Sequence, residues 1–146
     1  MQDFWNQRYA EPGYKYGTEP NAFLRETASR LSPAGQVLVP GDGEGRNSVW
    51  LAAQGHQVLA VDLAEVGLAK ARQLALAQGA EVSARLRTQR VDLSEWAPPV
   101  GQFDAVVLTY VHLPSSFRAE AHRRLATALR RGGLLILEAF HPSQLG

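Results

Sequence analysis

The sequence contains no cysteine, and this absence excludes several classes of protein at once. A disulfide scaffold, a cysteine-ligated zinc site and a thiol nucleophile all require that residue. A chain of 146 residues can bury roughly two thirds of its unfolded surface, so it can hold a core without such cross-links. We therefore expect one domain spanning residues 1–146.

An excess of charge of one sign is also lacking. Fifteen Lys and Arg residues stand against fourteen Asp and Glu residues, for a formal charge of +1. Such a balance creates no strong field to attract nucleic acid or anionic lipid, so we expect neither as a partner and expect a shaped site for a small molecule.

Long hydrophobic runs are missing as well. The apolar stretches near residues 105–111 and 134–137 are far shorter than the ~20 residues of a membrane helix. The opening residues MQDFWNQRY lack the charged start and apolar run of a secretory signal. Together with the absent cysteine, these features predict a soluble, cytoplasmic protein that does not bind membranes.

What the sequence does contain is an alternation of strands and helices. Short apolar runs bounded by turn residues predict strands at residues 36–39, 58–61, 86–91, 103–110 and 134–139. Helical periodicity predicts helices at residues 21–31, 47–54, 64–78 and 115–131, the last ended by Gly132 and Gly133. This order predicts an α/β fold with a doubly wound parallel sheet and a ligand site at the carboxyl ends of its strands.

A glycine-rich loop follows the first predicted strand directly. It contains Gly41, Gly43 and Gly45, and Asp62 ends the second strand about 20 residues later. Glycines let the backbone turn tightly and approach a ligand with no Cβ in the way. A carboxylate in that position can accept hydrogen bonds from both hydroxyls of a ribose. The combination predicts a nucleoside-binding site.

The spacing of the glycines narrows the type of nucleoside. The loop reads GxGxG followed by Arg46 and Asn47, whereas dinucleotide-binding folds have GxGxxG. A phosphate-binding P-loop would need Gly-Lys followed by Ser or Thr, which is absent. A nicotinamide-dependent dehydrogenase is thereby disfavoured and stays as an alternative.

PGDGEGRN followed by VLAVD resembles motif I and the next acidic position of the class I S-adenosylmethionine-dependent methyltransferases. Three further segments resemble the tellurite-resistance and thiopurine type of small-molecule methyltransferase: FWNQRYAEPGYKYGTEPNAFL, FDAVVLTYVHLP and LRRGGLLILEAFHPSQLG. The resemblance covers essentially the whole chain. It implies a Rossmann-like fold, S-adenosylmethionine as cofactor, S-adenosylhomocysteine as product, and a metalloid oxyanion or small thiol as acceptor.

The resemblance also implies a set of cofactor-binding residues. They are Gly41, Asp42, Gly43, Gly45, Asp62, Leu63, Asp92, Leu93, Thr109, Arg8 and Tyr16. Asp62 would hold the ribose hydroxyls, and Asp92 would face the adenine amino group. Residues 1–20 would form a lid, in which Arg8 is a candidate partner for the methionine carboxylate.

Catalysis of methyl transfer needs little acid–base chemistry. The reaction is an in-line displacement, so the protein mainly aligns the reactants and excludes water. The candidate catalytic residues are Tyr110 and His112. The resemblance places Tyr110, at the end of the fourth strand, beside the sulfonium, and His112, just beyond the strand, is the candidate that faces the acceptor. The alternative for His112 is a histidine bonded to loop backbone. No pair of histidines has zinc-ligand spacing, and we expect no metal.

Two features depart from the family pattern. Asp42 stands where a small or sulfur-containing residue is frequent, and it either adds negative charge near the sulfonium or is a solvated loop residue. Family members also usually continue past the fifth strand through a helix and two more strands. We therefore expect the fifth strand to expose an edge that favours homodimerisation or marginal stability. The alternative function is that of a noncatalytic module that binds the cofactor.

Other polar and aromatic residues receive structural interpretations. Five arginines at positions 118, 123, 124, 130 and 131 are predicted to form the solvated face of one helix. Trp50 and Trp96 are predicted to pack in the core, His56 to be structural, and Asp104 to lie at the start of a strand without a chemical role.

Overall fold

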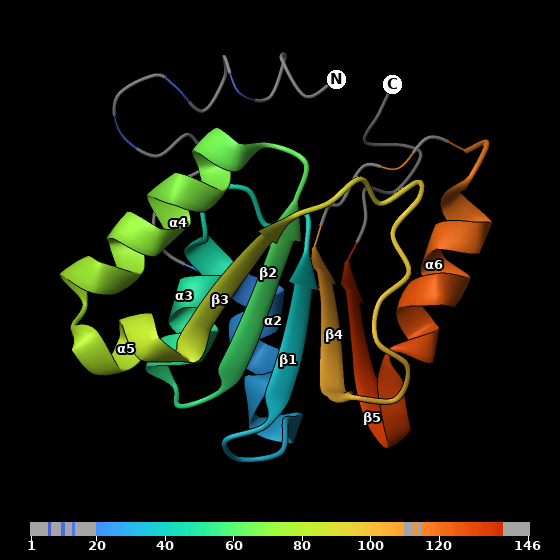
Figure 1. The fold of residues 1–146 in the computed structure, drawn as a ribbon. Helices are drawn as coiled ribbons and strands as arrows, with labels where there is room; N and C mark the ends of the chain where they lie inside the picture. The colour runs from blue at the N-terminus through green and yellow to red at the C-terminus, as the bar shows by residue number, and fades with distance from the viewer. Residues whose placement is uncertain are drawn as a thin grey trace.

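The computed structural model describes residues 20–109, Leu113 and 115–138, together with Asn6, Ala10 and Gly13. In this part of the chain, five parallel strands form one sheet in the order β3-β2-β1-β4-β5 (Figure 1). The strands are β1 (Gln36–Pro40), β2 (Gln57–Asp62), β3 (Leu86–Arg90), β4 (Phe103–Thr109) and β5 (Leu129–Glu138). The predicted doubly wound parallel sheet is confirmed.

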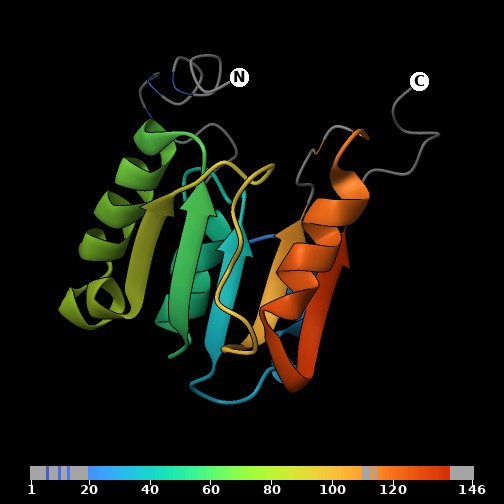
Figure 2. The ribbon, with the colours of Figure 1, turned by 45° about the vertical axis from the view of Figure 1, so that its right-hand side comes forward.

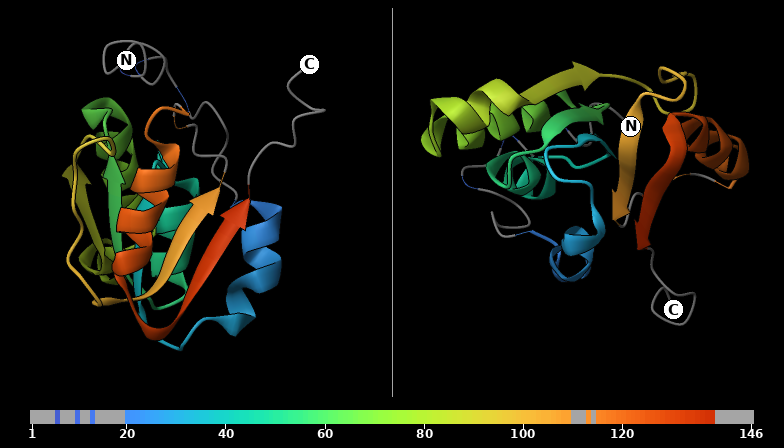
Figure 3. Two further views of the ribbon diagram at one scale, coloured as in Figure 1. Left: turned by 90° about the vertical axis from the view of Figure 1, so that its right-hand side faces the viewer. Right: turned by 90° about the horizontal axis from the view of Figure 1, so that it is seen from below.

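The helices cover both faces of this sheet. They are α2 (Ala22–Thr27), the 3₁₀ turn η1 (Ala28–Arg30), α3 (Arg46–Ala53), α4 (Glu65–Ala77), α5 (Ala80–Arg85) and α6 (Arg118–Thr127). The short helix α5 was not predicted, because six residues with one buried side chain, Val82, give no helical periodicity. Figure 3 shows α2 and α6 on opposite faces of the sheet.

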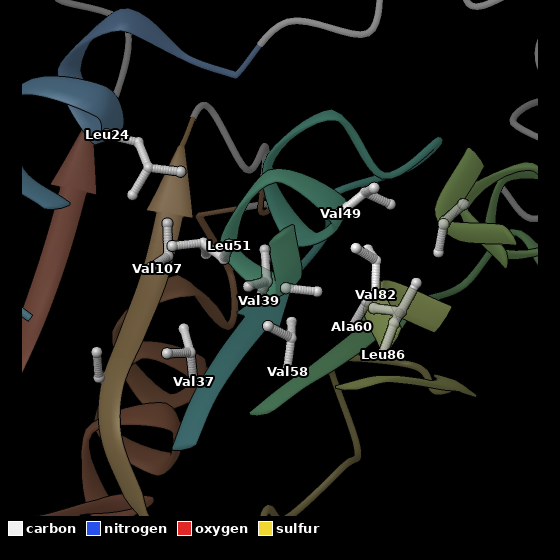
Figure 4. Packing of buried hydrophobic residues seen from close by; sticks show 14 of the residues in the cluster. Leu24, Val37, Val39, Val49, Leu51, Val58, Ala60, Val82, Leu86 and Val107 are labelled. Atoms are coloured by element: carbon white, nitrogen blue, oxygen red, sulfur yellow. The ribbon is translucent and has the colours of Figure 1, made fainter. Parts of the chain in front are cut away.

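Successive side chains of the strands pack alternately into two hydrophobic cores, one on each face of the sheet. Val37 and Val39 of β1 pack with α2, α3 and α4, in the cluster drawn in Figure 4. Leu38, between them, packs in a second cluster with Leu125 of α6. Because successive strand residues point to opposite faces, an uninterrupted apolar strand requires cover on both sides. Trp50 and Trp96 pack against these cores, as predicted.

The prediction of a helix over residues 115–131 is wrong at its carboxyl end. Helix α6 stops at Thr127, and the chain enters the sheet at once, because the Phe103 backbone N–H donates to the Ala128 carbonyl at 2.9 Å. Gly132 and Gly133 lie inside β5, not at a helix end. The register with β4 shifts there, and Gly132 has φ 82°. The two glycines belong to an irregularity in the strand. The helical spacing of the apolar residues before them gave no sign of it.

Strand β5 is the last in the order and pairs only with β4 within the described residues. Its Leu135 and Leu137 are 43% and 47% exposed, an unusual exposure for two neighbouring leucines on one face of a strand. In the same part of the chain, no helix is both long enough and apolar enough to cross a membrane.

Candidate functional site

The strands all point the same way, so their carboxyl ends meet at one end of the sheet (Figure 2). Strand β1 ends at Pro40, and β2 ends at Asp62, as predicted. The strand order reverses between β1 and β4, which is where ligands bind in open parallel sheets. The glycine loop and Asp62 therefore lie together at the expected position.

The glycine loop joins β1 to α3 and has a left-handed backbone at all three glycines. Gly41, Gly43 and Gly45 have φ angles of 69°, 65° and 95°. Residues with a Cβ seldom adopt these angles, so the loop shape requires glycine. The Gly41 N–H donates to the Val61 carbonyl at 2.7 Å, which ties the loop to β2.

Asp62 organises this loop. Its Oδ2 accepts a hydrogen bond from the Gly43 N–H at 2.9 Å, and its Oδ1 accepts one from the Ala64 N–H at 3.0 Å. The residue is 9% exposed, and this burial raises the pKa of Asp62 above its usual range despite the N–H donors that oppose the shift. An ionised carboxylate has about four acceptor positions, so these two bonds leave acceptor capacity for further donors. Leu63, the next cofactor-binding candidate, lies half-buried beside it.

Asp42 is held by the helix that follows the loop. Its Oδ2 accepts a hydrogen bond from the Ser48 N–H at 2.8 Å, in the first turn of α3. Burial raises the pKa of Asp42 to about 6, against the lowering effect of its hydrogen bonds to Ser48 and Asn47. The interpretation of Asp42 as a freely solvated loop residue is therefore wrong. The carboxylate caps α3, and its contact with a cofactor stays a prediction.

Asp92 follows β3 and is exposed at the same end of the sheet. Its Oδ1 accepts hydrogen bonds from the Ser94 N–H at 2.9 Å and the Ser94 hydroxyl at 2.6 Å, and these bonds lower the pKa of Asp92. Leu93, between them, is partly buried against the α6-side core. The two predicted adenine-side residues thus belong to one compact turn.

Arg124 of α6 fixes this turn, and the sequence provided no signal for its role. Its Nη2 donates to the carbonyls of Leu93 at 3.1 Å and Ser94 at 3.0 Å. Arg118, at the start of the same helix, donates through Nε and Nη2 to the Leu113 carbonyl at 3.1 and 3.0 Å. Helix α6 thereby holds the chain beyond both β3 and β4.

The prediction of one solvated arginine face is therefore wrong. Arg118 and Arg124 are bonded to loop carbonyls, and Arg130 and Arg131 belong to β5, not to the helix. Of the three helix arginines, Arg118, Arg123 and Arg124, only Arg123 fits the prediction of a solvated side chain. It is exposed and pairs with the exposed Glu120. Arginine carries five donors on a long stem, and periodicity does not reveal which carbonyl it reaches.

Several predicted site residues lie outside the described residues. They are Arg8, Tyr16, Tyr110 and His112, and only the backbone of Thr109, the last residue of β4, is described. Their roles stay predictions.

Asn47 of the GRN segment has a structural role that was not predicted. Its Oδ1 accepts a hydrogen bond from the Asn21 N–H at 2.7 Å, and both residues are buried. Asn21 in turn caps α2 by accepting from the Leu24 N–H at 3.1 Å. The helix after the glycine loop thus anchors the segment that precedes α2.

The opposite end of the sheet has a different character. Asp104 at the start of β4 accepts a hydrogen bond from the Gln36 N–H at 2.7 Å and pairs with Arg130. The Nδ1 of His56 accepts from the Gly35 N–H at 3.2 Å, so His56 is structural, as predicted. An open hollow of about 400 Å³ lies there, lined by residues that include Trp50 and His56. Its position at the amino ends of β1 and β2 separates it from the glycine loop.

The sheet order, the glycine loop and the strand-terminal acid define a Rossmann-like nucleoside-binding domain. A family model described as "Methyltransferase domain" matches residues 37–133, and the chain belongs to that family. The resemblance to S-adenosylmethionine-dependent methyltransferases is confirmed.

Individual relatives agree with this assignment. A thiopurine S-methyltransferase of Pseudomonas putida (strain GB-1) is 32% identical over 98% of this chain and 74% of its own length. A ubiquinone biosynthesis O-methyltransferase of Xanthomonas axonopodis pv. citri (strain 306) is 36% identical over 81% of this chain and 48% of its own length.

The crystal structure of the glycopeptide N-methyltransferase MtfA superposes with a TM-score of 0.68 at 27% identity, over 80% of this chain and 53% of that one. The chain therefore spans about half the length of that structure.

Proposed function

We propose that this chain binds S-adenosylmethionine at the carboxyl ends of β1 and β2 and transfers its methyl group to a small-molecule acceptor. The observation that supports this most directly is the bond from the Gly43 N–H to the buried carboxylate of Asp62. It joins the glycine loop and the acid of β2 into one unit, in which a bound nucleoside lies over the loop and its ribose hydroxyls donate to the acid.

The residues present fit such a cofactor. Asp62 keeps acceptor capacity for ribose hydroxyls, and the three left-handed glycines present backbone without a Cβ at their positions in the loop. When bound, S-adenosylmethionine supplies an electrophilic methyl group on a positively charged sulfur. The protein's part is to hold the nucleoside, to orient the acceptor and to exclude water. The carboxylate of Asp42 provides a negative charge in the same loop.

The relatives support the cofactor more firmly than the acceptor. MtfA, 26% identical here, has been solved in complex with sinefungin. The relatives named above are an S-, an O- and an N-methyltransferase, so their names indicate three different acceptor atoms. We propose a small thiol or a metalloid oxyanion, because the thiopurine S-methyltransferase matches 98% of this chain. Tyr110 is the proposed residue beside the sulfonium, and His112 is the proposed acceptor-facing residue.

Thermal unfolding with and without S-adenosylhomocysteine tests cofactor binding. A ligand at ~100 times its Kd adds about 2.7 kcal/mol of stability, which corresponds to a rise in Tm of about 5–10 °C for a domain of this size. NAD at the same concentration serves as the control and should cause no shift. A shift with NAD alone would favour the dehydrogenase and contradict the proposal.

Transfer of labelled methyl groups to a panel of thiols, selenite and tellurite then tests catalysis. We expect incorporation into at least one acceptor at a rate above that of boiled protein. Binding of S-adenosylhomocysteine without any transfer to the panel would instead support the noncatalytic module.

We also propose that two copies associate through β5. Within the described residues the strand lies at the end of the sheet order, and the exposed Leu135 and Leu137 lie on one of its faces. Sedimentation velocity of the wild-type chain and of a Leu135→Lys, Leu137→Lys variant tests this. A monomer at tens of micromolar wild-type protein would contradict it.

A cytoplasmic location and the lack of a nucleic-acid partner stay proposals that rest on the absent cysteine and the near-neutral charge.

A further inference from the structure

The hollow at the amino ends of β1 and β2 has the size and lining of a small-molecule site. Its volume of about 400 Å³ falls in the usual range for sites of small organic ligands. It lies between the turn η1 and the last turn of α3, and Leu31, Pro33 and Trp50 belong to its apolar lining. Strand β1, five residues at about 3.3 Å each, separates it from the glycine loop.

His56 is held rigidly in the wall of this hollow. Its backbone N–H donates to the Leu51 carbonyl at 3.2 Å, and its Nδ1 accepts from the Gly35 N–H at 3.2 Å. Because Nδ1 is an acceptor, a neutral imidazole carries its proton on Nε2. Burial lowers the pKa of His56, against the opposing effect of the Asp104 charge, and so favours the neutral ring.

The Nε2–H of His56 takes no part in these structural bonds. The described part of the chain contains no hydrogen-bond partner for it. Among the same residues, the only fully buried side-chain nitrogen or oxygen without a partner belongs to Arg124, so Nε2 is not sealed from solvent. The ring is only 5% exposed and lines the hollow. A ligand with an acceptor atom can therefore satisfy this donor from within the hollow.

Two further side chains indicate the chemistry of such a ligand. Trp50 is partly buried against the core and lines the hollow, and the face of an indole favours a flat aromatic ring. Arg25 of α2 also lines the hollow, and no acidic residue is among its described lining residues. The charge of this lining favours an anion, and a carboxylate accepts hydrogen bonds from imidazole and guanidinium groups alike.

The backbone of the same wall is strained at Ala34. Its φ angle is 53°, and among the described residues it is the one residue other than glycine with a positive φ. Ala34 also lines the hollow. Left-handed angles are unfavourable for a residue with a Cβ, and such strain is concentrated at functional sites. The backbone thus gives a second, independent indication of a binding site.

We propose that this hollow binds a small aromatic carboxylate, whose ring lies against Trp50 and whose carboxylate accepts a hydrogen bond from the Nε2–H of His56. Arg25 adds positive charge to the same wall. This site is distinct from that of S-adenosylmethionine, and its occupancy does not depend on the proposed function. The two sites lie at opposite ends of α3, which follows the glycine loop and carries Trp50 in its last turn.

Heteronuclear NMR of the 146-residue chain, titrated with phenylacetate, tests the site. We expect saturable shifts of the Trp50 indole N–H and of the Gly35 and His56 amides. The indole of Trp96, which packs in the α6-side core, should stay in place, and Trp50→Phe assigns the Trp50 signal. Phenylacetamide, the neutral isostere, should bind about 10-fold more weakly, because hydrogen bonds to a charged acceptor are stronger. Acetate, which lacks the ring, should give no saturable shift.

His56→Asn separates the proposed role of His56 from its structural role. The Asn Oδ1 replaces Nδ1 as the acceptor for the Gly35 N–H, whereas nothing in the side chain replaces the Nε2–H. We expect affinity for phenylacetate to fall by about 10-fold with little change in Tm. His122→Asn is the matched control, because α6 lies on the opposite face of the sheet from α2 (Figure 3), and it should bind as wild type does. If His56→Asn does not fold, Trp50→Leu removes the ring contact and should weaken binding instead.

Three results would overturn the proposal. The first is the absence of saturable shifts at tens of millimolar phenylacetate. The second is a set of shifts centred on Gly41, Gly43 and Gly45, which would place the ligand at the glycine loop. The third is equal affinity of the wild type and His56→Asn. Failure of the proposed function is seen separately, since S-adenosylhomocysteine would then leave the glycine-loop signals unchanged while phenylacetate still shifts Trp50.

Discussion

Gly45 and Ala71 approach so closely that no side chain fits between them. A Cβ built on Gly45 would lie 2.5 Å from the Cβ and 2.8 Å from the Cα of Ala71. The last glycine of the loop thus permits close packing of α3 against α4, the task that the third glycine performs in a GxGxxG loop. This packing role explains the glycine without a ligand, and the cofactor contact of Gly45 stays a prediction.

Gly45→Ala should destabilise the protein by about 2–5 kcal/mol, the sum of overpacking and of a left-handed φ angle of 95°. Urea unfolding measures the loss. In the double variant with Ala71→Gly, only part of the overpacking should be recovered, because the Cα of residue 71 would still lie 2.8 Å from the new Cβ. Full recovery would contradict a cost from the backbone angle and from the remaining Cα clash, and no recovery would contradict the contact with the Ala71 Cβ.

Asp62→Ala should weaken binding of S-adenosylhomocysteine by a few kcal/mol, because two ribose hydrogen bonds are lost. It should also lower Tm without ligand, since Asp62 holds the Gly43 and Ala64 N–H groups. Asp104→Ala is the matched control, because Asp104 bonds Gln36 and Arg130 at the amino end of β4. It should lower Tm and leave affinity in calorimetry within about twofold. Equal affinity losses in both variants would contradict the placement of the ribose.

Asp42 should make stability fall as pH rises. The folded-state pKa of about 6 exceeds the ordinary value of 3.8 for an aspartate, so the folded protein holds this proton more tightly than the unfolded chain does. Its stabilising contribution is complete below pH 3.8, declines between pH 3.8 and about 6, and is absent above that range. The difference in unfolding free energy between wild type and Asp42→Asn should change by on the order of 3 kcal/mol from pH 4 to pH 7. A pH-independent difference would exclude the raised pKa.

The same carboxylate should distinguish the charged cofactor from its neutral product. If Asp42 faces the sulfonium, affinity for S-adenosylmethionine relative to S-adenosylhomocysteine should increase as pH rises through about 6, where the carboxylate ionises. Calorimetry at pH 5 and pH 7.5 measures the ratio. In Asp42→Asn the ratio should stay constant, and a constant ratio in the wild type would place Asp42 away from the sulfur.

Arg124→Met should weaken binding of S-adenosylhomocysteine by about 3- to 10-fold, because the turn containing Leu93 loses two charge-assisted hydrogen bonds. Arg123→Met is the matched control, since that side chain is 73% exposed and pairs only with exposed Glu120 among the contacts described. Its affinity should remain within about twofold of wild type. Equal effects of the two variants in calorimetry would separate Arg124 from the cofactor site.

The sequence by itself determined most of the fold. Uninterrupted apolar runs bounded by turn residues, such as residues 37–39, favour strands covered on both faces, and the helices between them favour parallel pairing. The glycines after β1 and the acid at the end of β2 were also predicted from the sequence. Positive φ angles favour glycine, and the end of a strand is visible in the change from apolar residues to an acid. The end of α6 was missed, since the apolar spacing of residues 117–129 continues past Thr127 into a strand.

Only the tertiary structure decided which polar groups meet. Lys70 reaches Glu44 across 26 residues, and Arg124 reaches Leu93 across 31. Long, flexible side chains of this kind find partners that depend on how α4 and α6 pack on the sheet, and neither periodicity nor motif spacing encodes that geometry. The same reason explains Asp42, whose residue type suggested a charged loop residue and whose burial against α3 raises its pKa to about 6.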